Sequence, residues 1–286
     1  MKILITGANG LVGGETVSYC RSIGDEVSAM PRESLDIADR NQVFDFVTRE
    51  KPDSIINCAA WTDVDGCELN PEKNYSINAF GVENLASACK KVGANFVTIS
   101  TDYVFDGAKN GFYTQRDDVN PTSIYGQAKL EGERLAMKSL ARAIVVRSGW
   151  IFGTNGRNFL SKMPELLAAG KTIKAISDAH GTPTFAPDLA KRLRELAEAD
   201  LPAIYHVVNA GEGTTYELFA RTIADKLPNA EQSQIEAVSG STLKRPAPRP
   251  DNSKMSCLIS EKLGFAPLPN WTDALERYLN SPKSKV

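Results

Sequence analysis

Two side chains four residues apart, Tyr125 and Lys129, could together move a proton. If this stretch is helical, residues at that spacing share one helix face. A lysine ammonium one turn away can lower the pKa of the phenol, which can then exchange a proton with a carbonyl or alcohol oxygen near neutral pH. The same spacing is common on solvent-exposed helices, so the interpretation needs support from elsewhere in the chain.

Thr101 offers that support. It lies within Ser-Thr-Asp-Tyr-Val-Phe at 100–105, where a predicted strand ends. Ligands of doubly wound parallel sheets bind at the carboxyl ends of strands, so the Thr101 hydroxyl could bond the same substrate oxygen as Tyr125. The predicted catalytic set is Thr101, Tyr125 and Lys129. It requires no metal, and the chain's two histidines are interpreted as structural.

A glycine-rich segment, Thr-Gly-Ala-Asn-Gly-Leu-Val-Gly at 6–13, follows the first predicted strand. Its glycines permit a tight turn, close approach of the backbone to a pyrophosphate, and close packing of helix on strand. The next helix would present free N–H groups and a positive dipole end to phosphates. An ordinary strand-turn-helix is the alternative, but the position of the segment in a strand-helix-strand unit favours dinucleotide binding.

Short strand-like runs alternate with helical patterns through the first half of the chain, which is typical of a parallel sheet covered by helices. The predicted fold class is α/β: a Rossmann-like doubly wound parallel sheet over residues 1–150 and a smaller C-terminal substrate-binding lobe over residues 151–286, with late segments returning to the first sheet. Strands are predicted at 2–6, 26–30, 54–58, 95–100, 143–148 and 204–208, and later helices at 162–169, 187–198, 216–227 and 272–279.

Composition excludes several classes of function. The 33 Lys and Arg residues are balanced by 35 Asp and Glu residues, so no broad basic face is available for nucleic acid. The five cysteines include no C-x-x-C pair, which fits thiols in a reducing compartment better than disulfides or zinc. No apolar run approaches the ~20 residues of a membrane-spanning helix, and no secretory signal is found. A cytoplasmic protein without membrane or nucleic-acid partners is expected.

Taken together with further segments, these motifs resemble the extended short-chain dehydrogenase/reductase family. The glycine turn and the Tyr-x-x-x-Lys pair are typical of the whole family. Other segments are similar to a narrower branch that reduces dTDP-linked 4-keto-6-deoxy sugars: Ser-Thr-Asp-Tyr-Val-Phe, Arg-Ser-Gly-Trp at 147–150 and Asp-Ala-His-Gly-Thr-Pro-Thr at 178–184. Asn-Cys-Ala-Ala-Trp-Thr at 57–62 and Arg-Pro-Asp-Asn-Ser at 249–253 extend the resemblance over nearly the whole chain.

The resemblance implies roles for individual residues. Those at the cofactor would be Gly7, Gly10, Leu11 and Val12 on the pyrophosphate, Asp36 and Ile37 beside the adenine, Ala60, Trp61 and Thr62 along its middle, and Tyr125 with Lys129 at the nicotinamide ribose. Those at the substrate would be Thr101, Asp102 and Trp150 on the sugar, and Arg249, whose guanidinium suits phosphate oxygens, on the nucleotide diphosphate.

Three residues have simpler interpretations as well. Trp150 could be an ordinary core residue. Asp36 could be a polar residue before a helix. Asn78, within a helix predicted at 74–92, could be a satisfied polar group, although the family's water-mediated support of the catalytic lysine is preferred.

The implied reaction is NADPH-dependent reduction of the C4 ketone of a dTDP-4-dehydro-6-deoxy-hexose, of the type that converts dTDP-4-dehydrorhamnose to dTDP-rhamnose. A dehydratase is disfavoured, because similar dehydratases carry Asp-Glu after the threonine and here Asp102 is followed by Tyr103. Another nucleotide-sugar reductase or epimerase of the family, and a regulatory subunit resembling the β subunit of methionine adenosyltransferase, remain alternatives. The oligomeric state is left open, with a homodimer as one arrangement.

The end of the second predicted strand bears on cofactor choice. NAD-selective sites usually place an acid there against the ribose 2′-hydroxyl. Here Met30 is followed by Pro31 and Arg32, and the nearest acids are Glu33 and Asp36. Arg32 could pair with a 2′-phosphate, so NADPH is the predicted cofactor and NADH the alternative.

Overall fold

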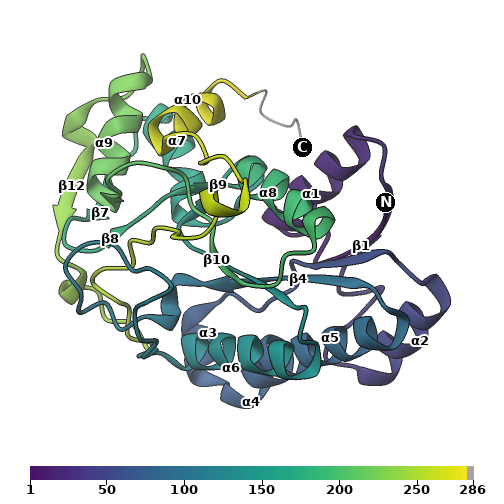
Figure 1. The fold of residues 1–286 in the computed structure, drawn as a ribbon. Coiled ribbons are helices and arrows are strands. Elements are labelled where there is room, and N and C mark those ends of the chain that lie inside the picture. The colour runs from purple at the N-terminus through teal and green to yellow at the C-terminus, as the bar shows by residue number, and fades with distance from the viewer. Residues whose placement is uncertain (282–286) are drawn as a thin grey trace.

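The computed structural model describes residues 1–281, and a six-stranded parallel sheet forms its centre (Figure 1). The strand order is β2-β1-β3-β4-β5-β10, and every neighbouring pair runs parallel. The predicted doubly wound α/β fold is confirmed, and each predicted strand lies within two residues of its observed bounds. These strands are β1 (Lys2–Thr6), β2 (Glu26–Met30), β3 (Ser54–Asn57), β4 (Asn95–Thr101), β5 (Ile144–Ser148) and β10 (Ile204–His206).

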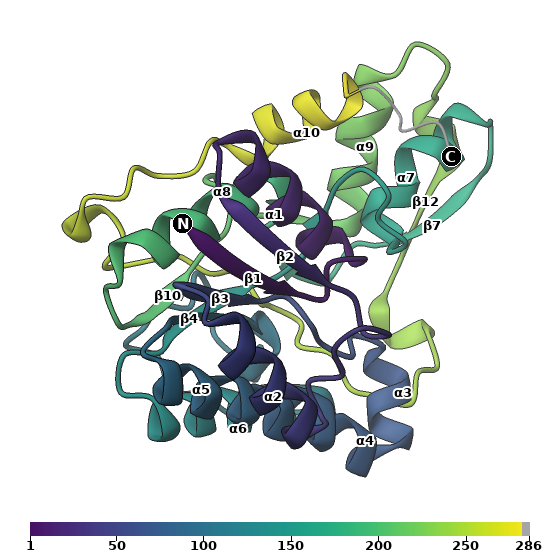
Figure 2. The same ribbon diagram turned by 90° about the vertical axis from the view of Figure 1, so that its right-hand side faces the viewer.

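Helices cover both faces of this sheet, as Figure 2 shows. Successive side chains of a strand point to opposite faces, so β1 sends Ile3 and Ile5 into a core with Leu189 and sends Leu4 into a second core with Val43. Two-sided burial explains why the strands are apolar almost throughout. The first layer holds α1 (Leu11–Ser22) and α8 (Ala186–Ala199), and the second holds α2 (Arg40–Glu50), α5 (Gly81–Val92) and α6 (Ile124–Ser139).

The strand order reverses at β1, which has β2 on one side and β3 on the other. Connections leave the two sides in opposite directions, which opens a crevice at the carboxyl ends of these strands. Buried polar side chains tie that edge together: Thr6 Oγ1 donates to Asn57 Oδ1 at 2.6 Å, and Asn57 Nδ2 donates to Thr98 Oγ1 at 3.0 Å. The fold therefore places a fixed polar edge where the glycine turn begins.

Three helices follow one another between β3 and β4. They are α3 (Val64–Leu69), α4 (Pro71–Tyr75) and α5, and a π-helical stretch, Ser76–Phe80, joins the last two. The sequence predicted one helix at 74–92, and the π-helical turn lies inside that range. A Cβ at Gly132 of α6 would lie only 2.3 Å from the carbonyl oxygen of Asn78 in this turn, so the glycine permits close contact of the two helices. Single π-helical turns are frequent at functional sites.

A smaller lobe lies beside the sheet (Figure 2). Its helices α7 (Phe159–Ala168), α9 (Tyr216–Lys226) and α10 (Trp271–Leu279) share one apolar core. The chain enters this lobe after β5, leaves it for α8 and β10, and enters it again at β11. Its strand pairs are β6 (Ile151–Phe152) with β9 (Thr184–Phe185), β7 (Ile173–Ile176) with β12 (Ile235–Val238), and β8 (His180–Gly181) with β11 (Thr214–Thr215).

The cysteines carry free thiols in this structure, and Cys20, Cys67 and Cys89 are buried. Within residues 1–281, no cluster of three or more His, Cys, Asp or Glu side chains could hold a metal ion. Over the same residues, no helix combines the length and apolar character needed to cross a membrane.

A buried ion pair joins the sheet to α6. Arg147 of β5 donates from Nε and Nη2 to the two carboxylate oxygens of Glu133, at 2.9 and 2.7 Å. Ser100 Oγ donates to the same carboxylate at 2.5 Å. The Arg147 and Glu133 side chains are only 6% and 1% exposed. A buried charge without its partner is strongly unfavourable, so each residue depends on the other.

Replacing Arg147 with Met should lower the free energy of unfolding by about 3–5 kcal/mol, because the Glu133 carboxylate stays in the core without a counter-charge. Urea unfolding followed by circular dichroism measures the change. The double variant Arg147→Met/Glu133→Gln should recover much of the loss, since neither charge remains. A double variant as unstable as Arg147→Met would contradict this account of the pair.

Candidate active site

The N-terminus of α6 carries the predicted proton donor. Ser123 caps the helix by accepting the Gly126 N–H at 3.2 Å, which places Tyr125 in the first turn. A Cβ at Gly126 would lie 2.3 Å from the carbonyl oxygen of Tyr103, so this turn packs directly on the segment that follows β4. The packing brings Tyr125 close to Thr101, whose side chain acts to lower the pKa of the Tyr125 phenol. Residues from a strand end and a helix start thus form one polar pair.

Lys129 lies one turn further along α6, and its side chain is buried. Its ammonium donates to the carbonyl oxygen of Ile99 in β4 at 2.6 Å. Desolvation lowers the pKa of Lys129 to about 8, against the opposing effect of the Glu133 carboxylate. The hydrogen bond to the Ile99 carbonyl therefore fixes the Lys129 ammonium near the carboxyl end of β4.

The predicted effect of Lys129 on Tyr125 is wrong for this conformation. Burial raises the pKa of the Tyr125 phenol, and the Thr101 side chain opposes that shift only in part. Tyr125 and Lys129 are one helical turn apart, as predicted. The spacing argument, however, did not include the free-energy cost of removing a phenolate from water, which raises the pKa. Tyr125 is consequently protonated at neutral pH.

Asp102 follows Thr101 and is also buried. Its Oδ1 accepts the Thr101 hydroxyl at 3.0 Å, while its Oδ2 has no hydrogen-bond partner within residues 1–281. Desolvation raises the pKa of Asp102 to about 6, although interactions with Ser253 and Thr101 favour the charged form. A Cβ at Gly149 would lie 2.4 Å from this carboxyl group, so a glycine is required there. The unpartnered oxygen is buried in this conformation, so a ligand hydroxyl could bond it only after a local movement of the neighbouring groups.

Trp150 faces the same space from the lobe side and also packs against the apolar core of the lobe, so its interpretation as a core residue describes part of its surroundings. Its ring stacks on Tyr216 with centroids 4.0 Å apart, and its backbone adopts a φ of 50°. Gly181 lies against the indole, because a Cβ there would come within 2.0 Å of the ring. The pair forms a flat aromatic wall that is suited to an apolar face of a ligand.

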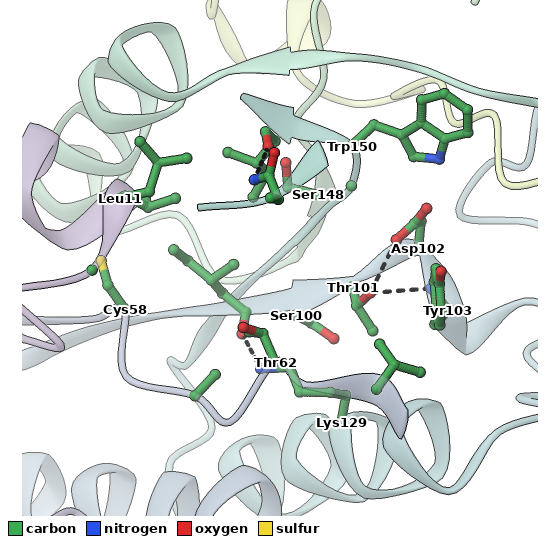
Figure 3. Close-up of a pocket in the computed structure, with 18 of the residues that line it drawn as sticks. Leu11, Cys58, Thr62, Ser100, Thr101, Asp102, Tyr103, Lys129, Ser148 and Trp150 are labelled. Atoms are coloured by element: carbon green, nitrogen blue, oxygen red, sulfur yellow. Dashed lines mark hydrogen bonds between the residues drawn. The ribbon is translucent and has the colours of Figure 1, made fainter. Parts of the chain in front are cut away.

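These residues line one cavity of about 430 Å³. Figure 3 shows Thr101, Asp102, Lys129 and Trp150 arranged around it, with Leu11 on the far side. The walls come from the glycine turn, the segment after β3, the end of β4, α6 and the lobe. The predicted residues on this cavity are Gly10, Leu11, Val12, Ala60, Thr62, Thr101, Asp102, Tyr125, Lys129 and Trp150.

A second cavity of about 230 Å³ adjoins the first along the glycine turn, and Gly10 and Ala60 line both. Gly7 has a φ of 66°, and a Cβ there would lie 2.7 Å from the Ala59 nitrogen, so only glycine fits. Gly10 caps α1 without a side-chain bond, which leaves helix N–H groups free for an anion. The predicted residues on this cavity are Gly7, Gly10, Arg32, Asp36, Ile37, Ala60 and Trp61. The elongated pair of cavities fits a dinucleotide that crosses the turn at its pyrophosphate.

Arg32 and Asp36 lie together at the second cavity. The guanidinium approaches the Asp36 carboxylate at 3.6 Å, and 64% of the Arg32 side chain is exposed. Asp36 also accepts the Ala38 N–H at 3.0 Å, so the simpler interpretation as a polar residue before a helix describes part of its role. The Arg32 guanidinium is exposed enough to meet a phosphate at this position.

Arg249 is the predicted site residue that lines neither cavity. Its guanidinium makes a bidentate pair with Asp65 of α3, at 2.6 and 3.0 Å, and lies close enough to Tyr103 for that residue to raise the pKa of Arg249. Tyr103 does line the larger cavity, so Arg249 lies behind its wall. A diphosphate could reach this guanidinium only if Asp65 gave way.

Sequence reasoning did not select several cavity residues. Tyr216, Phe159 and Asn158 come from the starts of lobe helices far along the chain, and their local patterns are those of ordinary helix starts. Gly149 directly precedes Trp150 in the Arg-Ser-Gly-Trp segment at 147–150. A glycine next to a predicted site residue is the sequence signal that could have identified it.

The parallel sheet, the glycine turn and the Thr101, Tyr125 and Lys129 cluster define a Rossmann-fold protein of the short-chain dehydrogenase/reductase class. Comparison with known protein families refines this class. The RmlD substrate binding domain family matches residues 1–283, and the chain belongs to this family.

Individual relatives agree with that assignment. The chain is 37% identical to a dTDP-4-dehydrorhamnose reductase of Streptomyces griseus, over 95% of this chain and 91% of the relative. Among solved structures, a dTDP-4-dehydrorhamnose reductase of Clostridium acetobutylicum has a TM-score of 0.92 at 35% identity, covering 98% of this chain and 99% of that one. A Bacillus anthracis dTDP-4-dehydrorhamnose reductase in complex with NADP has the same TM-score at 33% identity and the same coverage.

The Asp102→Asn variant should be more stable than the native protein at pH 7.5. The folded-state pKa of about 6 lies above the ordinary value of 3.8, so the native fold favours the protonated acid. Above pH 6 the ionised carboxylate therefore lowers the free energy of unfolding. A rise of one to two units in the pKa corresponds to about 1–3 kcal/mol. Below about pH 4 both proteins carry a neutral side chain, and the difference should vanish.

Urea unfolding of both proteins at pH 7.5 and pH 4 measures this change. The equivalent variant of an exposed residue, Asp45→Asn, is the control. Equal stability of Asp102→Asn and the native protein at both pH values would refute the raised pKa.

Proposed function

We propose that this protein is an oxidoreductase that uses NADPH to reduce the C4 ketone of a dTDP-4-dehydro-6-deoxy-hexose, as in the formation of dTDP-rhamnose. One observation carries the proposal: the Thr101 and Tyr125 side chains line the same cavity as Lys129, and this cavity continues along the glycine turn. The names of the relatives support the sugar, and the NADP complex of the Bacillus anthracis structure supports the cofactor.

Tyr125 would give its proton to the C4 oxygen of the sugar. When bound, the reduced nicotinamide supplies the hydride that the ketone carbon accepts. Burial keeps the Tyr125 phenol protonated at neutral pH by raising its pKa, which is the form that a reduction requires of its acid. Thr101 would hold the same oxygen by a hydrogen bond. The Lys129 ammonium, one turn away, would stabilise the phenolate that the transfer leaves.

Other residues would hold the sugar nucleotide. After a local movement, the unpartnered Asp102 Oδ2 would accept a sugar hydroxyl, and the stacked Trp150 and Tyr216 rings would cover an apolar face of the ring. Arg249 would exchange the Asp65 carboxylate for diphosphate oxygens, because both are bidentate partners of a guanidinium. In this proposal residues 1–150, with α8 and β10 returning to them, hold the cofactor, and the rest of residues 151–286 hold the substrate.

The proposal is tested by following NADPH oxidation with dTDP-, UDP- and GDP-linked 4-keto-6-deoxy sugars. Turnover should be fastest with the dTDP-linked compound. Turnover with a UDP- or GDP-linked sugar alone would indicate another reductase or epimerase of the class. NADPH binding without oxidation of any of the three would refute the enzymatic proposal and favour a regulatory subunit.

Replacing Tyr125 with Phe should lower kcat by about 10²–10⁴-fold, the usual contribution of general acid catalysis. Only one oxygen is lost, so the Kd for NADPH and the thermal midpoint should stay close to native values. The control is Tyr205→Phe, because Tyr205 donates its hydroxyl to the Leu201 carbonyl at 2.9 Å in the core. Near-native turnover in Tyr125→Phe would remove Tyr125 as the proton donor.

Replacing Arg32 with Ala should reduce the preference for NADPH over NADH by at least about tenfold in kcat/KM, because a charge-assisted contact with a 2′-phosphate is lost. The ratio of kcat/KM for the two cofactors measures it. Arg49→Ala is the control, since Arg49 is an exposed residue of α2 paired with Glu50. A native preference for NADH, or an unchanged ratio in Arg32→Ala, would show that Arg32 has no such role.

A further inference from the structure

Two buried asparagines, Asn74 and Asn78, connect the segment after β3 to the catalytic helix. Asn78 accepts the Trp61 N–H at 3.0 Å and donates to the Trp61 carbonyl at 2.9 Å. The same amide nitrogen donates to Asn74 Oδ1 at 2.7 Å, and Asn74 Nδ2 donates to the Ile124 carbonyl at 2.8 Å. An unbroken series of hydrogen bonds therefore runs from residue 61 to residue 124.

The two ends of this series lie at functional positions. Trp61 lines the smaller cavity, next to Ala60, which lines both. Ile124 is the first residue of α6 and directly precedes Tyr125. A displacement of the Trp61 backbone would therefore be transmitted, through these hydrogen bonds, to the start of α6.

Further contacts hold each end. The Lys73 ammonium lies 4.1 Å from the centroid of the Trp61 ring, so α4 contacts the side chain of this residue while Asn78 of the π-helical stretch binds its backbone. At the other end, the Ile124 N–H donates to Glu68 Oε2 at 2.9 Å. Both polar backbone atoms of Ile124 are thus bound by side chains from the α3 and α4 region, which also holds Trp61.

The asparagine pair is placed where water cannot replace it. Asn74 is 0% exposed and Asn78 is 1% exposed. When a buried amide loses one hydrogen-bond partner, water cannot replace that partner, so the loss is costly. The hydrogen bonds of Asn74 and Asn78 are therefore expected to shift together or break together. This property distinguishes the pair from apolar packing, which would tolerate small independent movements of its two neighbours.

We propose that Asn74 is a positioning residue that, through Asn78, couples the Trp61 segment to the N-terminus of α6, so that occupation of the dinucleotide cavity fixes Tyr125 for proton transfer. The identity of the occupant and the reaction rest on the proposed function. The mechanical coupling between residues 61 and 124 rests only on the hydrogen bonds above.

Hydrogen exchange of the native protein and of Asn74→Ala, each with and without NADP⁺, tests the coupling without any turnover. In the native protein NADP⁺ should protect the amides of residues 58–63 and also those at the start of α6. In Asn74→Ala the first protection should persist and the second should be lost. Asn95→Ala is the matched control, because Asn95 also donates to a backbone carbonyl, that of Ala197 at 3.0 Å, at the far end of β4.

Kinetics provides the second readout. With an active keto-sugar substrate, Asn74→Ala should lower kcat at least about tenfold, while the KM for NADPH changes less than about threefold, because the change acts on the acid and not on cofactor binding. In a Tyr125→Phe background the same change should have little further effect on kcat, since the group it positions no longer acts. Asn74→Asp keeps the acceptor for Asn78 but loses the donor to Ile124, and it should reproduce the loss if Asn74→Ala does not fold.

The outcomes separate the two proposals. A native protein without turnover fails the proposed function, while the exchange experiment still decides the coupling. Full protection of the α6 N-terminus by NADP⁺ in Asn74→Ala or Asn74→Asp would overturn the coupling. If Asn74→Ala lowers kcat by the same factor with and without the Tyr125→Phe change, its role is generally structural, and the coupling is overturned as well.

Discussion

The backbone contact between Gly7 and Ala59 brings the ends of β1 and β3 together, and no side chain could stand between them. From this contact the chain continues in two directions. One is the turn to Gly10 and α1, which is closed by the Gly10 N–H bond to the Gly7 carbonyl at 2.9 Å. The other is the segment through Trp61, which is bound by Asn78 of the π-helical turn, and Asn78 in turn donates to Asn74 of α4. The floor of both cavities is therefore determined where the strand order reverses.

Burial acts in the same sense on three ionisable side chains that line the larger cavity, Asp102, Tyr125 and Lys129. It raises the pKa of Asp102 and of Tyr125 and lowers that of Lys129, so each group is driven toward its neutral form. In the proposed reaction, this effect keeps the Tyr125 acid protonated before a neutral ketone binds. The fold retains the Asp102 Oδ2 without a hydrogen-bond partner in the wall of the larger cavity. Locally unfavourable groups of this kind are common at functional sites.

The alternation of short apolar runs and helical patterns was enough to predict the parallel sheet, because two-sided burial leaves a strong local signal in strands such as β1 and β5. The glycine turn and Thr101 could be predicted because each lies at or directly after the end of such a strand, whereas Tyr125 and Lys129 could be predicted from their spacing of four residues on one helix face. Contacts between distant segments left no local signal. The Asn74 and Asn78 bonds, the stacking of Tyr216 on Trp150 and the pairing of Arg249 with Asp65 depend on tertiary packing, and the shift of the Tyr125 pKa depends on desolvation that spacing does not report.

The smaller lobe is built from two separate stretches of chain, because α8 and β10 return to the central sheet between them. β10 pairs with β5, and α8 packs against α1, so this returning piece cannot travel with the lobe. A single crossover between the two stretches would split the shared core of Phe152 and Phe219 between two parents. A single crossover before the first stretch would keep that core together but would take α8 and β10 from the other parent than the rest of the sheet. Chimeras that transfer the whole lobe and keep the sheet from one parent should need three joints, one after β5 and one on each side of the returning segment.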